Sequence, residues 1–263
     1  MTTLVSKRSF STTRSVIALI FREMSTTYGR SPGGYIWAIL EPVLAISLMT
    51  VVFSYALRSP ALGVSFPLFY ATGYFPFTMY NDMTMKVGQA IKFNKNLLAY
   101  PNVTYVDAIA GRAVLSSLTN ALVFSIFILG LIVIGGMHLN VNFVRLVNAF
   151  GMSISLGVGI GVINCYVMSR FPIWTSIWSI INRPMFIISG IFFPVDEVGE
   201  PYRTILLYNP MAHVIMQMRS AFYPTYDANY VSHVYVYSIA FVLLFFGFLL
   251  LNRYHRYILD EGA

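Results

Sequence analysis

The most regular feature of the sequence is a series of long apolar runs separated by short polar and charged stretches. A helix needs about 20 mainly apolar residues to cross the hydrocarbon core of a bilayer. Six stretches reach this length with at most one charged residue each, and they are 31–57, 59–81, 113–144, 146–169, 171–195 and 228–252. The pattern therefore predicts an all-α integral membrane protein with six transmembrane helices and both termini on one side.

The distribution of Lys and Arg predicts which side that is, because short cytoplasmic loops carry an excess of these residues. If the amino end is cytoplasmic, eleven Lys and Arg fall in cytoplasmic segments and four fall outside. The cytoplasmic set is Lys7, Arg8, Arg14, Arg22, Arg30, Lys86, Lys92, Lys95, Arg170, Arg253 and Arg256, and the outer set is Arg58, Arg145, Arg203 and Arg219. We therefore expect both termini in the cytoplasm.

Residues 1–30 form a cytoplasmic tail that ends in a helical pattern over 14–28, too short and too charged to cross a membrane. One face is apolar and consists of Ile17, Ile20, Phe21, Met24 and Tyr28. The residues expected to face lipid headgroups are Arg14, Arg22 and Arg30. The pattern predicts an amphipathic helix in the cytoplasmic interface. A helix packed on a partner protein is the alternative.

The connection between spans two and three, residues 86–105, is longer than a tight helical connection requires. A short helix is predicted within 89–98, followed by Pro101, which ends it. Its apolar contacts would come from Ile91, Leu97 and Leu98, with Lys92 and Lys95 solvated. The segment suits contact with another protein, although an interfacial helix lying on lipid is also compatible with the pattern.

The connection between spans five and six, residues 194–232, contains an apolar segment that Asn209 and Pro210 interrupt. Such a broken helix can dip into the outer leaflet only where protein or a water-filled cavity covers its exposed backbone. We therefore expect a periplasmic re-entrant hairpin here.

The composition supports a single membrane domain over 1–263. Hydrophobic residues make up 57% of the chain and charged residues 10%, far from the values of soluble domains. The net charge of +7 is scattered over the ends of the apolar runs, which argues against nucleic-acid binding. Cys165 is the only cysteine, so no intrachain disulfide can form.

No motif for catalysis or metal binding is present. The chain lacks a Gly-rich phosphate loop ending in Gly-Lys-Ser/Thr and a Gly-x-Ser-x-Gly nucleophile elbow. The four histidines lie far apart, without the spacing of metal ligands. We expect a protein that is not an enzyme, and any ATP-driven work must then come from another chain. An intramembrane enzyme is the remote alternative.

Several polar and aromatic positions within the spans are candidates for a transport pathway. Arg183 lies inside an apolar span, where a guanidinium must meet water, a partner or a ligand. The hypothesis is that it contacts cargo; the alternative is that it snorkels to the interface or pairs with Asp82, Asp107 or Glu41. Arg112 with Asp107 is interpreted as a pair near a helix start. The aromatic candidates are Trp37, Tyr70, Tyr74, Phe77, Tyr80, Trp174 and Trp178. They suit a sliding sugar chain, although anchoring at the membrane interface explains many such residues.

A strip of small residues follows one face of the fourth span. Ser153, Gly157 and Gly161 recur at intervals of four, which allows close approach of another helix. The sequence leaves open whether that helix belongs to the same chain or to a second copy.

The sequence resembles a known family, the type 2 ABC-exporter permeases. The similarity extends over nearly the whole chain and is carried by YGRS at 28–31, GYIWA at 34–38, LEP at 40–42, NLLAYP at 96–101, SGIFF at 189–193, and YNP at 208–210 with His213 and Arg219. Within the family the chain is most similar to the capsular polysaccharide export inner-membrane permeases. One departure is Met216, where many relatives carry a glutamate three residues before the arginine that corresponds to Arg219.

The resemblance implies a transport subunit without its own cofactor in the bacterial inner membrane. It implies a homodimer, two copies of a separate ATP-binding subunit that holds ATP and Mg, a lipid-linked acidic polysaccharide as cargo, and periplasmic and outer-membrane export proteins. It also implies that the cytoplasmic segment docks on the ATP-binding subunit, through Ile91, Lys92, Lys95, Leu97, Leu98 and Tyr100. A permease for O-antigen, teichoic acid, or a small lipid or drug is the alternative of the same fold.

Overall fold

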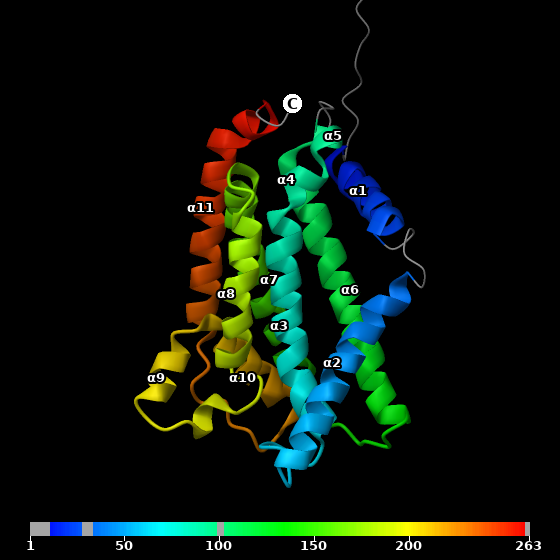
Figure 1. Ribbon diagram of the computed structural model, residues 1–263, viewed down its shortest axis with the longest axis vertical. Helices are drawn as coiled ribbons and strands as arrows, with labels where there is room; N and C mark the ends of the chain where they lie inside the picture. Colours follow the sequence, from blue (N-terminus) through cyan, green and yellow to red (C-terminus); the bar gives the residue numbers. More distant parts are fainter. Residues whose placement is uncertain (1–10, 28–33, 99–102, 261–263) are drawn as a thin grey trace, which may run out of the picture.

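The computed structural model describes residues 11–27, 34–98 and 103–260, and all regular structure in these ranges is helical (Figure 1). The longer helices are α1 (Ser11–Thr27), α2 (Tyr35–Ala56), α3 (Phe66–Gly88), α6 (Tyr105–Val133), α7 (Phe143–Arg170), α8 (Trp174–Ile188), α10 (Pro210–Phe222) and α11 (His233–Asp260). The short ones are α4 (Ala90–Phe93), α5 (Lys95–Leu98), the 3₁₀ turn η1 (Val195–Glu197) and α9 (Tyr202–Leu207). This confirms the all-α class.

Four helices of the described chain are long and apolar enough to cross a bilayer, in the segments Ile36–Ala56, Tyr105–Val133, Phe143–Arg170 and His233–Tyr254. The other two predicted spans correspond to α3 and α8, which run alongside them in Figure 1. α3 is less apolar because it includes Asn81, Asp82 and Lys86, and α8 has only 15 residues. Fifteen residues extend about 22 Å, less than the roughly 30 Å of hydrocarbon. Crossing by α3 and α8 stays a prediction.

α3 begins and ends later than the expected span 59–81. Ser65 caps its first turn by accepting a hydrogen bond from the Leu68 N–H, and the helix then continues past Asp82 to Gly88. Asp82 is accommodated because its Oδ2 lies 2.9 Å from Lys86 Nζ and accepts a hydrogen bond from Asn120 Nδ2 at 3.1 Å. The expected span ended before Asp82 because it was drawn from hydropathy alone. In the structure this carboxylate is paired, and α3 continues past it.

α7 packs between α3 and α11, and the strip of small residues lies on the α3 side. Ser153 Oγ donates to the Pro76 carbonyl at 2.7 Å. A Cβ atom added at Gly157 would lie 2.5 Å from Met83 Cβ, and one at Gly161 would lie 2.8 Å from Val87 Cβ. The sequence left the strip's partner open, and in the structure that partner is α3 of the same chain.

The molecule has two distinct ends. One end, which we call the basic end, carries α1, α4, α5 and the last turns of α11 (Figure 1). The predicted cytoplasmic Lys and Arg that the structure describes lie at this end, and they are Arg14, Arg22, Lys86, Lys92, Lys95, Arg170 and Arg253; Arg112 of α6 lies there as well. The opposite end carries Arg58, Arg145, Arg203 and Arg219. The helices thus separate the two predicted sets of Lys and Arg. The side of the membrane that each end faces stays a prediction.

The segment between α8 and α11 is broken where the sequence indicated, at Asn209 and Pro210. Asn209 caps α10, because its Oδ1 accepts from the Met211 N–H at 3.0 Å and its Nδ2 donates to Ser189 Oγ at 2.9 Å. Every residue of α10 from Met211 to Phe222 is buried. Protein therefore covers this short helix, as a re-entrant segment requires. Its depth in a membrane stays a prediction.

α6 starts at Tyr105, eight positions before the expected third span. Asp107 and Arg112 both lie in this helix, but they do not form the predicted ion pair. Asp107 belongs to a capping box, in which its Oδ2 accepts from the Thr104 N–H and the Thr104 hydroxyl accepts from the Asp107 N–H. Arg112 does not pair with Asp107 and forms an ion pair with Glu23 of α1. The sequence interpretation was therefore wrong about the partner of Arg112.

Candidate functional site

The predicted coupling helix over 89–98 is divided at Asn94 into two single turns, α4 and α5. The Asn94 side chain folds back and donates through Nδ2 to the Ala90 carbonyl at 3.1 Å. That carbonyl also accepts the Asn94 N–H at 3.2 Å. An asparagine that satisfies its own turn in this way competes with helix continuation, so the segment bends here.

The predicted coupling residues have different environments. Ile91 is buried against Ile109 and Cys165 in the core of the chain. Lys92 is exposed, while Lys95, Leu97 and Leu98 are half-buried. Tyr100 lies outside the described residues. The side chains that another protein could reach directly are therefore those of Lys92, Lys95 and the two leucines, and Ile91 supports them from behind.

α1 packs along α6 rather than lying free. Leu19 and Glu23 face α6 and are buried, whereas Ile17 and Phe21 are exposed. Of the residues expected at lipid headgroups, Arg14 is exposed, and Arg22 donates to Asn94 Oδ1 at 3.2 Å. Arg30 lies outside the described residues. The exposed apolar face remains compatible with an interfacial helix, with its other face attached to the bundle.

A buried ion pair at the basic end was not foreseen from the sequence. Arg112 Nε lies 3.1 Å from Glu23 Oε1, and the two side chains are only 7% and 10% exposed. Arg112 Nη1 also donates to the Lys86 carbonyl at 2.7 Å, and the guanidinium lies over the Phe93 ring at 4.1 Å. The two charges are 89 residues apart in the chain, so no local signal linked them.

Two of the predicted pathway residues, Trp37 and Tyr74, line a cavity of about 310 Å³ between α2, α3 and α6. Polar side chains make up much of its wall, and they are Glu41, Thr78, Asp82, Lys86, Thr119 and Asn120. Trp37 is 56% exposed, so part of this side chain lies at the surface of the molecule.

Two others, Phe77 and Arg183, line a mostly apolar groove of about 560 Å³ between α3 and α8. Arg183 is exposed, and within the described residues no carboxylate lies at ion-pairing distance from it. Asp82 and Asp107, two of its expected alternative partners, are engaged elsewhere. A guanidinium on an apolar groove in this position is suited to an anionic group of an amphiphile.

The remaining aromatic candidates occupy supporting positions. Tyr70 and Tyr80 are fully buried in the core and line neither of these two cavities. Trp174 Nε1 donates to Asn164 Oδ1 and Trp178 Nε1 to Thr84 Oγ1, both at 3.0 Å. These indoles attach α8 to α7 and α3, and the aromatic count alone gave no indication of this.

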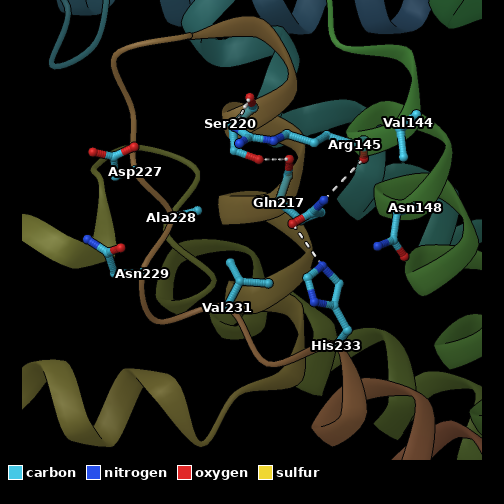
Figure 2. Close-up of a pocket in the computed structure, with 10 residues that line it drawn as sticks. All are labelled: Val144, Arg145, Asn148, Gln217, Ser220, Asp227, Ala228, Asn229, Val231 and His233. Atoms are coloured by element: carbon cyan, nitrogen blue, oxygen red, sulfur yellow. Dashed lines mark hydrogen bonds between the residues drawn. The ribbon is translucent and has the colours of Figure 1, made fainter.

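A third cavity, of about 400 Å³, is lined by residues of the first turns of α7 and α11 and of α10, at the end opposite the basic end. Figure 2 shows its lining residues. Gln217 of α10 stands at its centre, where its Oε1 lies 3.0 Å from His233 Nε2 and its Nε2 donates to the Arg145 carbonyl at 3.4 Å. Arg145 Nη1 donates to the Ser220 carbonyl at 3.1 Å. These contacts join the first turns of α7 and α11 to α10 around a polar wall.

Arg219, a residue of the family resemblance, has no exposed surface. Its two terminal nitrogens donate to the carbonyls of Phe193 and Ile191 at 2.9 and 2.8 Å, and the guanidinium lies 4.3 Å from the centre of the Phe69 ring. It therefore holds the turn after α8, where Gly190 has a φ of +82°, against α3 and α10.

Comparisons with known proteins agree with one another. Residues 14–223 match the family described as ABC-2 type transporter. The chain is 33% identical over 233 residues to the polysialic acid transport protein KpsM of Escherichia coli, covering 89% of this chain and 90% of that protein. It is 25% identical to the capsule polysaccharide export inner-membrane protein CtrC of Neisseria meningitidis and 24% identical to BexB of Haemophilus influenzae, with 92% of each chain covered in both cases.

Proposed function

Because this chain belongs to the ABC-2 type transporter membrane family, we propose that it is the transmembrane subunit of an ATP-driven exporter that moves lipid-linked capsular polysaccharide across the bacterial inner membrane. The observation that carries the proposal is the 33% identity to KpsM over 89% of this chain and 90% of that relative. Similarity of this extent includes both ends of the helical bundle, and the four long apolar helices fit a membrane subunit.

The energy and most of the machinery are supplied by other chains. We propose a homodimer that binds two copies of an ATP-binding subunit, which holds ATP and Mg, and that delivers polymer to periplasmic and outer-membrane export proteins. The basic end then faces the cytoplasm together with both termini. α3 and α8 complete six spans, and α9 with α10 forms the re-entrant hairpin at the periplasmic side. The protein cover on α10 supports this arrangement.

The cargo pathway follows the surfaces on either side of α3. Arg183 and Phe77 supply the charged and aromatic groups of the α3–α8 groove, and Trp37 and Tyr74 supply the ring faces of the other cavity. Stacking on ring faces lets a sugar chain slide, while the guanidinium attracts the anionic group at its lipid terminus or along an acidic chain. Tyr70, Tyr80, Trp174 and Trp178 are assigned to holding these walls in place.

Coupling to the ATP-binding subunit takes place at the basic end. Lys92, Lys95, Leu97 and Leu98 provide its contact surface, backed by Ile91 and continued toward Tyr100. Arg14, Arg22 and Arg30 belong to the interfacial segment next to it, with anionic headgroups within reach of the exposed members.

The test is to delete the gene for this chain in its own host and to measure polysaccharide on the surface and inside the cell. We expect surface polymer to disappear and lipid-linked polymer to accumulate inside, with recovery when the chain is restored. Arg183→Gln should restore export poorly and Arg183→Lys partly, while the exposed Arg58→Gln serves as the matched control. Unchanged surface polymer in the deletion strain would refute the function, and mass spectrometry of the accumulated glycolipid would identify the cargo.

A further inference from the structure

The basic end contains an arrangement that the export function does not by itself explain. Glu23 of α1 and the end of α3 meet at the guanidinium of Arg112 on α6, and neither Glu23 nor Arg112 lines either cavity that flanks α3. We propose that Arg112 is a positioning residue that joins α1, α6 and the coupling segment into one rigid unit. Displacement of α4 and α5 by the ATP-binding subunit then carries α1 with it. The proposal rests on the proposed function, because it assigns the route of that coupling.

The contacts of Arg112 account for all three elements. One nitrogen pairs with Glu23, another donates to the Lys86 carbonyl within the last turn of α3, and the face of the guanidinium covers Phe93 of α4. The last four carbonyls of a helix lack partners within it, and a cation at that end is favoured by the helix dipole. The guanidinium is therefore fixed on several sides, whereas a lysine offers a point charge without this planar fork.

Burial makes the connection stiff. An exposed ion pair exchanges readily with water, whereas opening one that is 7% and 10% exposed would leave two charges without solvent. A second bond lies alongside, because Arg22 of α1 donates to Asn94 between α4 and α5. Two neighbouring residues of α1 are thus connected to the coupling segment, Arg22 directly at Asn94 and Glu23 through Arg112, which covers Phe93.

Close packing adds to the connection. Gly111 lies next to Arg112 on α6, and a Cβ atom built there would lie 3.5 Å from Leu19 Cβ and 3.7 Å from the Val16 carbonyl oxygen of α1. A side chain at this position would meet α1 in ordinary van der Waals contact, so the two helices lie next to each other beside the ion pair. This geometry also provides the means of testing the proposal, since a disulfide requires Cβ atoms about 3.5–4.5 Å apart.

The experiment uses the complete exporter, permease with its ATP-binding subunit, in reconstituted vesicles. Glu23→Gln and Arg112→Gln should still bind the ATP-binding subunit and support ATP hydrolysis, while polymer exported per ATP falls about tenfold, the scale of a typical coupling between sites. The matched control is Glu200→Gln, which removes the exposed Glu200–Arg203 pair at the other end. Equal export per ATP in wild type and Glu23→Gln would overturn the proposal.

A reversible crosslink separates the rigid connection from simple stability. In a Cys165→Ala background, Leu19→Cys with Gly111→Cys should form a disulfide on oxidation and still export. The same disulfide should restore export to Glu23→Gln, and reduction should remove it again. Export that stops on oxidation while Glu23 is present would show that α1 moves against α6, which refutes the proposal. Absence of export by wild type would instead refute the proposed function.

Discussion

The close approach of α7 to α3 leads to a quantitative prediction for Gly157→Ala. The added methyl group would lie 2.5 Å from Met83 Cβ and 3.2 Å from the Tyr80 carbonyl oxygen. Neither atom can turn aside, because a Cβ and a carbonyl oxygen are fixed by the α3 backbone. Ordinary van der Waals contact begins near 3.4 Å, so the helices would have to separate locally by about 0.9 Å, the difference between 3.4 and 2.5 Å.

The cost of this separation exceeds any gain from replacing glycine in a helix. Alanine in place of glycine favours an exposed helix interior by about 1 kcal/mol. Overpacking in a well-packed core costs about 1–3 kcal/mol, and here it would also weaken the bond from Ser153 Oγ to the Pro76 carbonyl one turn away. We therefore expect a net loss of about 1–2 kcal/mol in unfolding free energy.

The assay is denaturant unfolding of the purified protein in detergent micelles, read out by tryptophan fluorescence. Gly130→Ala in α6 is the matched control, because nothing lies within 4 Å of a Cβ atom at that position. We expect the control to equal or exceed the wild type in stability. Gly157→Ala as stable as Gly130→Ala would refute the packing argument. A change in oligomeric state with unchanged stability would instead place the strip between two copies.

Three further predictions concern single side chains, each measured by the same unfolding assay. Arg219→Lys loses the fork that reaches two carbonyls and should cost about 2 kcal/mol, whereas Arg203→Lys at an exposed pair should change little; equal effects would contradict the role of burial. Trp178→Phe loses the bond to Thr84 and should cost about 1 kcal/mol, and adding Thr84→Val should cost less than its effect alone; strict additivity would refute the contact. Asn209→Ala removes the cap of α10 and should cost about 1 kcal/mol, an idea abandoned if Asn229→Ala in the neighbouring loop is equally destabilising.

Apolar run length identified the four described helices that are long and apolar enough to cross a bilayer. The apolar stretches located α2, α6, α7 and α11, although α6 begins eight residues before the expected span and includes the paired Arg112. It misplaced the end of α3, because Asp82 is satisfied by Lys86 and by Asn120 of another helix. The hydropathy of one segment gives no information about a partner on another helix. The Glu23–Arg112 pair could not be predicted for the same reason.

The candidate site was predicted in outline only. Residue type identified Trp37, Tyr74, Phe77 and Arg183, which line the two surfaces beside α3. The same aromatic chemistry also suits the interior, and Tyr80 is buried there because α7 covers that side of α3. Which side a neighbouring helix covers depends on tertiary packing, so aromatic content alone could not separate a wall residue from a core residue.

The position of α7 between α3 and α11 has a consequence for which helices can move relative to one another. Its glycines bring α3 against one side and α11 against the other, where a Cβ at Gly159 would lie 2.6 Å from the Ala240 carbonyl oxygen. Because α3, α7 and α11 are packed this closely, they cannot slide along one another without steric overlap. We expect them to move as one unit. α2 and α8 bury few of their residues, and α8 is attached mainly through the hydrogen bonds of Trp174 and Trp178. We therefore expect changes of shape during export to involve α2 and α8 rather than α3, α7 and α11.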